Sequence, residues 1–255
     1  METRVLIAGF SGVYADENLA PSLGGRNVTE LDFSDIEGTN CYCDPEAEME
    51  IARRLGSVPA AEDTLPVRFI DSGDYHYVSC ITGGMVGEPF VLLLLDNHPD
   101  TQDPAFGGLL SCGGWVSELA RRNRFLQAVI SAGPDGLCRV ADASGGELSE
   151  TESVPLSEAR ALLGRFRKGA KGGLPFIVSI DKDVLSEDFA RTNWSQGSMS
   201  FDELEAILGE AFRSRVLAVD ICGEKPSSKG GDGEDFRINR VADIRILDMI
   251  DSLCK

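Results

Sequence analysis

Residues 90–100 read FVLLLLDNHPD and join an apolar run directly to a cluster of polar side chains. An apolar run of this length, with no polar residue on either face, is typical of a parallel strand covered by helices on both sides. In an extended chain alternate side chains point the same way. Asp96, His98 and Asp100 can therefore converge just beyond the end of the predicted strand.

The rest of the chain alternates short β-rich runs with helical patterns. The predicted strands are Arg4–Phe10, Val67–Ile70, Phe90–Leu95, Leu126–Ile130, Phe176–Ile180 and Val216–Val219. The predicted helices are Pro45–Leu55, Trp115–Arg122, Leu156–Arg167, Phe201–Arg213 and Ile238–Leu253. This alternation predicts an α/β fold with a doubly wound, mostly parallel sheet in one domain over residues 1–255. Residues 141–152 and 225–235 are rich in Ser, Gly and charge, and we expect surface loops there.

Composition narrows the classes of partner. The formal net charge is −18, from 42 acidic and 24 basic residues. Such a surface repels phosphate backbones, which argues against nucleic acid, and it attracts small cationic substrates. An apolar run of membrane-spanning length is absent from the sequence, and METRVLIAGF at residues 1–10 does not have the pattern of a signal peptide. We therefore expect a cytoplasmic protein without membrane contact, whose seven scattered cysteines are reduced thiols.

Polar residues follow several predicted strands. FIDSGDYHY carries His76, and DKD carries Asp181 and Asp183. Because ligands of open α/β sheets bind at the carboxyl ends of strands, we expect these side chains to meet those of residues 96–100. Four carboxylates in one place are costly without cations, and two divalent ions would neutralise them. Imidazole together with carboxylates suits Mn, Fe, Ni or Zn, and Lys182 is expected to point away.

Four segments, taken together and in order, resemble the motifs of the ureohydrolase family, which contains arginases and agmatinases. DSGDYHYVS is similar to the family's GGDHS segment, DNHPDTQ to DAHxD, SIDKDVL to SxDxD, and VDICGE to DIxE. The match extends from about Val67 to Pro226. The chain resembles an atypical, arginase-like bacterial member of the family. The resemblance implies a three-layer α/β/α fold of the arginase and deacetylase type and a binuclear metal site, usually manganese.

The resemblance also implies a role for each matched residue. The metal ligands would be His76, Asp96, His98, Asp100, Asp181 and Asp183. Of these, Asp96 and Asp181 would bridge the two ions. A hydroxide between the ions would attack a planar guanidinium-like carbon and release urea or ammonia. Asp100 would accept a hydrogen bond from that hydroxide, and Glu224 would pair with the cationic group.

Among the departures from the family motifs, which also include Ser186 and Glu187 after the D-x-D run and the segment at residues 192–197, three concern single side chains of the site. Tyr75 is inserted before His76, and Cys112 stands where arginases carry a histidine in an HG segment. Glu224 comes one residue later than the family pattern. Cys112 could act as a proton relay or a reactive thiol, although a small buried hydrophobe is the commoner role for cysteine.

Two further segments are candidates for the substrate side of the pocket. The segment at residues 192–197, TNWSQG, offers Asn193, Trp194 and Gln196 as an aromatic wall with amide groups, or else a surface loop. Asn40 belongs to a turn before the predicted helix at Pro45, and it either faces the pocket or only shapes the turn. Trp115 is interpreted as helix packing and Cys222 as core.

Three functions compete at this point. The first is a two-metal hydrolase of a linear C–N bond in a guanidino or amidino compound. The second is a deacetylase-like amidohydrolase with a single zinc ion, and the third is a metal- or ligand-binding protein without catalysis. The family resemblance also favours a homo-oligomer.

Overall fold

A nine-stranded sheet is the centre of the computed structural model, which describes residues 1–59, 61, 63–103, 108–169 and 173–255. The strand order is β2-β1-β4-β11-β10-β5-β7-β8-β9. The strands are β1 Glu2–Gly9, β2 Val28–Asp32, β4 Thr64–Phe69, β5 Phe90–Leu95, β7 Leu126–Ala132, β8 Leu137–Asp142, β9 Ser149–Pro155, β10 Phe176–Asp181 and β11 Val216–Cys222. The strands from β2 to β7 are parallel, and β8 and β9 are antiparallel to their neighbours.

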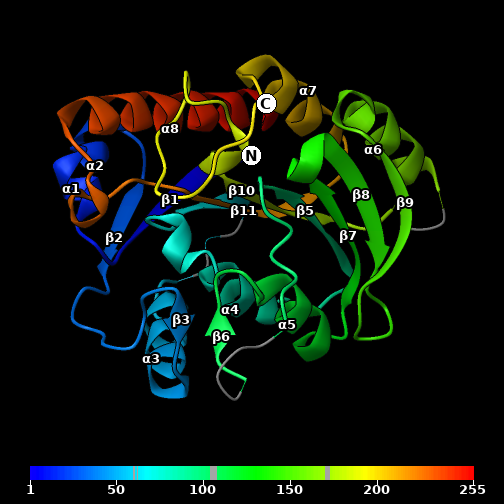
Figure 1. Cartoon of the computed structure of the whole chain (residues 1–255), viewed down its shortest axis with the longest axis horizontal. Coiled ribbons are helices and arrows are strands. Elements are labelled where there is room, and N and C mark those ends of the chain that lie inside the picture. Colours follow the sequence, from blue (N-terminus) through cyan, green and yellow to red (C-terminus); the bar gives the residue numbers. More distant parts are fainter. Residues whose placement is uncertain (60, 62, 104–107, 170–172) are drawn as a thin grey trace.

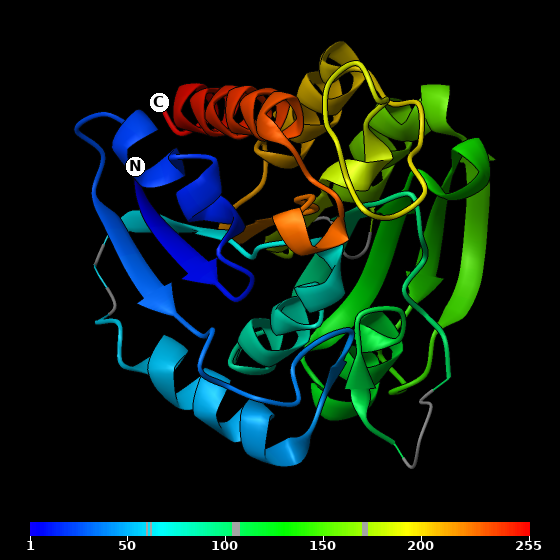
Figure 2. The ribbon, with the colours of Figure 1, turned by 60° about the vertical axis from the view of Figure 1, so that its left-hand side comes forward.

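Helices lie on both faces of this sheet. They are α1 Val13–Asp16, α2 Leu19–Ser22, α3 Pro45–Gly56, α4 Val78–Gly84, α5 Trp115–Arg122, α6 Ala159–Lys168, α7 Phe201–Ala211 and α8 Gly233–Leu253. Figure 1 shows α6, α7 and α8 on one side of the sheet and α3, α4 and α5 on the other. Figure 2, turned by 60°, keeps the red α8 and the light blue α3 on opposite sides. The predicted doubly wound, three-layer α/β/α fold is therefore confirmed.

Burial explains why β5 is apolar throughout. Val91, Leu93 and Leu95 belong to the hydrophobic core on the side of α8, whereas Leu92 and Leu94 belong to the core on the side of α5. Because successive side chains of a strand point to opposite faces, a strand between two helical layers needs apolar residues at every position.

The small two-stranded sheet of β3, Tyr42–Cys43, and β6, Leu110–Ser111, lies apart from the main sheet. Its strands are antiparallel, with Tyr42 opposite Ser111. β3 leads directly into α3, where the Asp44 side chain accepts hydrogen bonds from two backbone N–H groups of the first turn. This sheet therefore joins two segments that are distant in sequence.

The predicted elements agree with the structure at the centre of the sheet and differ at its edges. The five predicted helices are present, although α8 begins at Gly233, five residues before the predicted start. Residues 141–152, predicted as a loop, contain the end of β8 and the start of β9. The prediction was wrong there because β9 is exposed along almost its whole length and shows no hydrophobic alternation. Residues 225–235 likewise include the first turn of α8.

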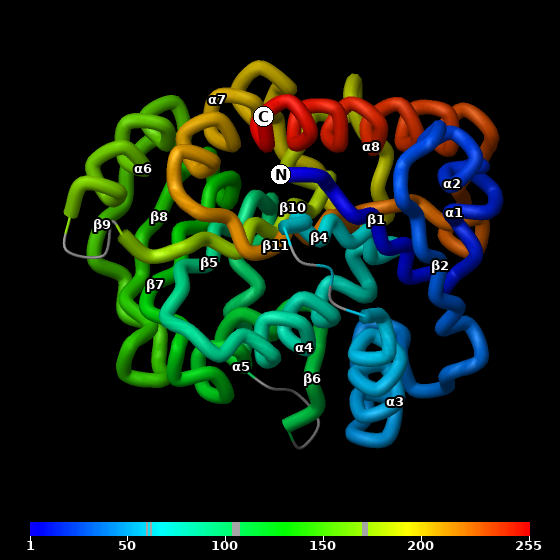
Figure 3. The backbone as a smooth tube through the Cα atoms, turned by 180° about the vertical axis from the view of Figure 1, so that it is seen from behind, coloured from blue at the N-terminus to red at the C-terminus, as the bar shows by residue number. Residues whose placement is uncertain are grey.

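The two ends of the chain lie close together. Figure 3 shows the N-terminus at β1 near the end of α8, and the Met1 ammonium donates a hydrogen bond to the backbone oxygen of Cys254 at 2.9 Å. Among the residues that the structure describes, a helix long and apolar enough to cross a membrane is not found.

Candidate metal centre

The neighbouring strands β4, β11, β10 and β5 run parallel and end at one edge of the sheet. His76 follows β4 after the 3-10 turn Gly73–Tyr75, and Asp96 follows β5. Asp181 ends β10, and Cys222 ends β11. Strand pairing therefore brings together side chains from four separate parts of the sequence.

A first cluster surrounds His76. Its Nδ1 lies 3.3 Å from Asp96 Oδ2, 3.2 Å from Asp100 Oδ2 and 3.6 Å from Asp181 Oδ2. The ring is held from its other side, because Nε2 lies 2.8 Å from Ser179 Oγ. A proton on Nε2 can be donated to Ser179, which leaves the Nδ1 lone pair facing the carboxylates.

A second cluster surrounds His98, whose side chain is 32% exposed. Its Nδ1 lies 2.8 Å from Asp183 Oδ2 and 3.5 Å from Asp96 Oδ1. The other ring nitrogen, Nε2, lies 2.9 Å from Ser195 Oγ. Asp183 is oriented by the backbone N–H of Asn97, which donates to its Oδ1 at 2.9 Å. Each histidine thus presents Nδ1 to acidic groups and Nε2 to a serine.

Asp96 belongs to both clusters. Its Oδ2 faces His76 and its Oδ1 faces His98, so one carboxylate presents one oxygen to each histidine. At this site three groups of possible ligand atoms have members within 4.8 Å of one another: His76 with Asp96 and Asp100, Asp96 with His98 and Asp183, and His76 with Asp181 and Cys222. The six residues predicted as metal ligands are therefore gathered in one place. Metal binding itself remains a prediction.

The electrostatics of the clusters favour bound cations or protons. Burial, followed by the charges of Asp183 and Asp96, raises the pKa of Asp181 to about 7. Burial and the charge of Asp96 raise the pKa of Asp183 to about 6. Hydrogen bonds to Asp183 and Asp96 raise the pKa of His98 to about 11. The buried Nδ1 of His76 and Oδ2 of Asp96 have no hydrogen-bond partner among the described residues. Such orphaned ligand atoms facing each other fit a divalent ion.

Trp115 is part of this site, although its sequence context suggested only helix packing. Its indole Nε1 donates to Asp100 Oδ2 at 2.7 Å, and its ring centroid lies 4.9 Å from that of His76. The side chain is fully buried at the start of α5. A buried indole N–H needs an acceptor, so a tryptophan in a predicted buried helix indicates a polar partner, but the sequence does not show that the partner is Asp100.

Cys222 also reaches the site. Its Sγ lies 3.3 Å from Asp181 Oδ2, and it forms one of the ligand groups with His76 and Asp181. The sequence prediction of a core cysteine is correct for burial but missed this contact, because the end of a buried strand gives no indication of which side chain faces its neighbour.

A pocket of about 240 Å³ opens onto these clusters. Its lining is Cys41, Tyr42, Gly73, Asp96, His98, Asp100, Gln102, Ser111, Cys112, Gly113, Asp181, Asp183 and Trp194. Trp194 is 40% exposed, and its ring packs edge-on against His98 at 5.9 Å between centroids. The described lining includes four aspartates and neither lysine nor arginine.

Asp74 anchors the loop that carries Trp194. Its Oδ1 accepts hydrogen bonds from Asn193 Nδ2 and Trp194 Nε1, both at 2.9 Å, and its Oδ2 lies 3.0 Å from Lys229 Nζ. Of the predicted substrate-binding residues, Trp194 therefore lines the pocket, whereas the amide of Asn193 is bonded to Asp74.

The other two predicted amide contacts lie elsewhere. The Gln196 side chain donates to the backbone oxygens of Leu185 and Ala190 and stabilises its own loop. Asn40 accepts a hydrogen bond from the Cys41 thiol at 3.2 Å and is outside the described lining of the pocket. Tyr75, the inserted residue, stacks on Phe10 at 4.3 Å and is absorbed in the core.

Glu224 does not face the pocket, contrary to the sequence prediction. Its carboxylate is fully buried and accepts a hydrogen bond from Lys182, whose Nζ also lies 2.6 Å from Asp243 Oδ1. Lys182 points away from Asp181 and Asp183, as predicted. Gly223 lies beside Asp181 instead: its φ is +100°, and a Cβ there would collide with Asp181 Oδ1 and the backbone of Lys182. The one-residue offset of Glu224 thus turns its side chain away from the site.

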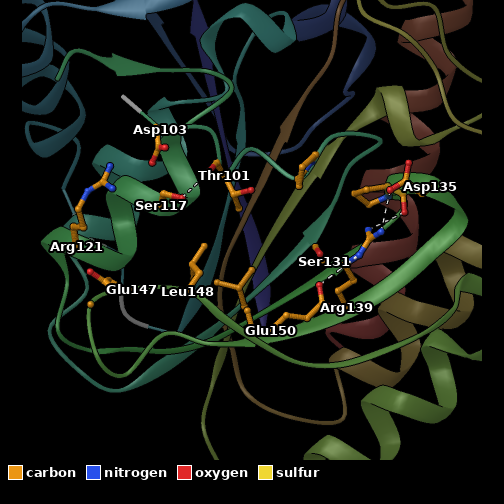
Figure 4. Close-up of a pocket in the computed structure, with 15 residues that line it drawn as sticks. Thr101, Asp103, Ser117, Arg121, Ser131, Asp135, Arg139, Glu147, Leu148 and Glu150 are labelled. Carbon is orange, nitrogen blue, oxygen red and sulfur yellow. Dashed lines mark hydrogen bonds and ion pairs between the residues drawn. The ribbon is translucent and has the colours of Figure 1, made fainter. Parts of the chain in front are cut away.

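A larger cavity, of about 630 Å³, lies outside the metal centre. Figure 4 shows it between the segment after β5, α5 and the strands of the β8–β9 hairpin. Arg139 in its wall is paired with Asp135 at 2.9 Å and Glu150 at 3.7 Å. Its described walls hold neither of the histidines, so we place the chemistry in the smaller pocket.

The sequence and the fold of this chain are both similar to those of known proteins. No family model matches the chain. An uncharacterized protein of Thermotoga maritima is 30% identical over 224 residues, which cover 87% of this chain and 80% of that protein. The solved arginase of Medicago truncatula superposes with a TM-score of 0.68 at 15% identity, covering 99% of this chain and 87% of that one. Proclavaminate amidino hydrolase of Streptomyces clavuligerus gives a TM-score of 0.65 at 15% identity, covering 100% and 92%.

Proposed function

This chain belongs to one family with the Thermotoga maritima protein and has the fold of the arginases, and on that premise we propose that it is a two-metal hydrolase of a linear C–N bond. The substrate would be a small cationic guanidino or amidino compound. The observation that carries the proposal is Asp96, which turns one oxygen to the His76 cluster and the other to the His98 cluster.

In this proposal the candidate ligands divide into two sets around Asp96. His76, Asp100 and Asp181 would hold one ion, and His98 with Asp183 the other. Two divalent ions, with manganese first and nickel, iron or zinc as alternatives, would neutralise the carboxylates and supply a water of lowered pKa together with a Lewis acid. The serines behind each histidine support the ring orientation that this requires.

The chain itself supplies attraction and positioning. The aspartates and the absence of a basic side chain in the described lining favour a cation in the pocket. Trp194 can cover the face of a planar cation, an interaction that partial desolvation strengthens. Since Glu224 is committed to Lys182, the aspartates themselves are the candidates for pairing with the guanidinium group. Asp100, held by Trp115, is the best placed to accept a proton or a hydrogen bond beside His76.

The decisive experiment is metal stoichiometry. Protein expressed with Mn, Ni, Zn and Fe would be analysed by elemental mass spectrometry, and we expect two ions per chain. Because Asp96 is shared, Asp96→Ala should lose both ions, whereas His98→Ala should lose one. Two ions per chain would justify testing a panel of guanidino and amidino compounds for urea or ammonia release. An absence of bound metal under every supply, or of any product across that panel, would contradict the proposal.

A single-zinc amidohydrolase is the second candidate, and the His76, Asp181 and Cys222 group favours it. A thiolate beside an imidazole and a carboxylate is a zinc-type ligand set. One tightly bound zinc per chain, lost in Cys222→Ser and retained in His98→Ala, would support this candidate over the two-metal site.

A further inference from the structure

We propose that Cys41 and Cys112, at the rim of the metal pocket, form a reversible disulfide with each other when the protein meets a low-molecular-weight disulfide such as oxidised glutathione. Three observations support this proposal: two short strands bring the cysteines together, both cysteines line the pocket, and the other cysteines differ from them in pKa or in position. The inference does not depend on the hydrolase activity proposed above.

The backbone brings the two cysteines face to face. In the β3–β6 sheet Cys43 lies opposite Leu110 and Tyr42 opposite Ser111. Cys41 and Cys112 are the next residues beyond these pairs, and the φ of +58° at Cys41 ends the extended conformation there. The backbone N–H of Cys112 donates to the oxygen of Cys41 at 2.9 Å, which continues the pairing. Opposed residues of antiparallel strands have Cα atoms about 4.5–5.5 Å apart. Disulfides span Cα distances of about 4.4–6.8 Å, and a direct backbone hydrogen bond between Cys41 and Cys112 holds their Cα atoms close enough for such a bridge.

Access and reactivity also single out this pair. Both cysteines line the pocket, and Cys41 is half-buried. A hydrogen bond with Cys112 lowers the pKa of the Cys41 thiol, and the same contact, together with burial, raises the pKa of Cys112. Cys41 is therefore the thiol that ionises first and attacks an oxidant, with a second thiol in place to resolve it.

The other cysteines lack this combination. Burial raises the pKa of Cys43, Cys80 and Cys138 to about 12 in each case. Cys222 is buried beside Asp181 in the metal centre. Cys254 is half-exposed like Cys41, but burial raises its pKa. Cys254 therefore serves as the matched control for Cys41, because it is a thiol of similar exposure that has no cysteine on a neighbouring strand among the described residues.

The reaction balances as two thiol–disulfide exchanges. The Cys41 thiolate attacks one sulfur of oxidised glutathione, forms a mixed disulfide and releases one glutathione thiolate. The Cys112 thiolate, formed by loss of its proton, then attacks the Cys41 sulfur and releases the second. The two protein thiols are oxidised, and the glutathione disulfide is reduced to two thiols. The crosslink ties β3 to β6 and so changes the rim of the pocket without using any of its histidines or aspartates.

The test uses the full chain, reduced and then equilibrated with glutathione buffers of increasing oxidised fraction. After acid quenching and alkylation, chymotrypsin cuts after aromatic residues such as Tyr42 and so separates Cys41 from Cys43. We expect a linked peptide pair containing Cys41 and Cys112 that appears with a single midpoint and disappears with dithiothreitol. The link should be absent from Cys41→Ser and Cys112→Ser and present in Cys254→Ser.

The wild-type peptide map decides the question even if a serine variant fails to fold. A stable mixed disulfide with glutathione on Cys41, without the internal link, would overturn the proposal. So would alkylation of both thiols at the most oxidising ratio while circular dichroism shows a folded chain. Because the map needs neither metal nor substrate, its outcome is separate from that of the metal and turnover measurements.

Discussion

Trp115 is a side chain outside the predicted ligand set that orients one of the predicted ligands. Its indole N–H donates to the Asp100 oxygen that faces His76. Trp115→Phe keeps an aromatic ring but removes that donor, so Asp100 should be less well oriented. We expect metal affinity to fall by roughly 10–100-fold, as for other outer hydrogen bonds of metal sites. Competition with a chelating dye would measure this change.

The control for Trp115→Phe is Tyr77→Phe. Tyr77 is also a fully buried aromatic, and its hydroxyl donates to the Thr39 backbone oxygen at 2.7 Å rather than to the ligand set. If both variants lost affinity equally, the hydrogen bond to Asp100 would not be the cause.

Gly223 is required by the shape of the site. A side chain there would meet Asp181 Oδ1 and the backbone of Lys182, and its φ of +100° favours glycine. Gly223→Ala should therefore displace Asp181 and reduce the metal content, which elemental analysis would detect. Gly230→Ala is the control, because Gly230 also has positive φ but has open space around its Cβ position. Unchanged metal content in Gly223→Ala would argue against Asp181 as a ligand.

At the scale of elements, a buried network ties β10, β11 and α8 together behind the metal centre. Lys182 follows β10, Glu224 follows β11, and Asp243 lies on α8. Lys182→Met would leave the two carboxylates buried without their cation. We expect the free energy of unfolding to fall by about 3–5 kcal/mol in urea denaturation.

The control for the network is Arg237→Met, which removes an exposed pair with Glu234 on the same helix. Exposed pairs contribute about 0–1 kcal/mol, so this variant should be close to wild type. Adding Glu224→Gln to Lys182→Met removes one of the uncompensated charges and should recover part of the loss. A stability of Lys182→Met equal to that of Arg237→Met would show that the network is not required.

At the scale of the whole molecule, stability should depend on pH in the absence of metal. Burial raises the pKa of Asp181 to about 7 and of Asp183 to about 6, so the folded chain binds these protons more tightly than the unfolded chain does. Their contribution to stability is complete below the ordinary pKa near 4 and is lost as the pH rises through 6 to 7. With EDTA present, thermal melting should therefore show a lower Tm at pH 8 than at pH 5.5.

Added manganese should reverse this trend, because ligands must lose their protons to bind metal. The increase in Tm caused by manganese should thus be larger at pH 8 than at pH 5.5. A Tm that rises with pH in EDTA would contradict the charge arrangement described above. The variant Asp181→Asn removes one of the two titrating groups and should flatten the metal-free curve.

The central strands and the residues that gather at their ends could be predicted from the sequence, because both depend on local patterns; metal binding by those residues stays a prediction. An apolar strand such as residues 90–95 and a D-x-H-x-D run after it are continuous in the chain, and alternation in an extended segment says which side chains can converge. The edge strand β9 escaped prediction for the opposite reason, since an exposed strand carries no apolar pattern.

Contacts between distant segments needed the folded chain. Trp115 and Cys222 reach the site, and Glu224 turns from it to Lys182, through the pairing of strands and the packing of helices on them. Glu224 lies just beyond β11, so the direction of its side chain depends on the backbone conformation at Gly223, where φ is +100°. The local sequence therefore determines which residue types are available for a site. The tertiary structure decides which of their side chains come into contact, because separation along the chain does not give distance in space.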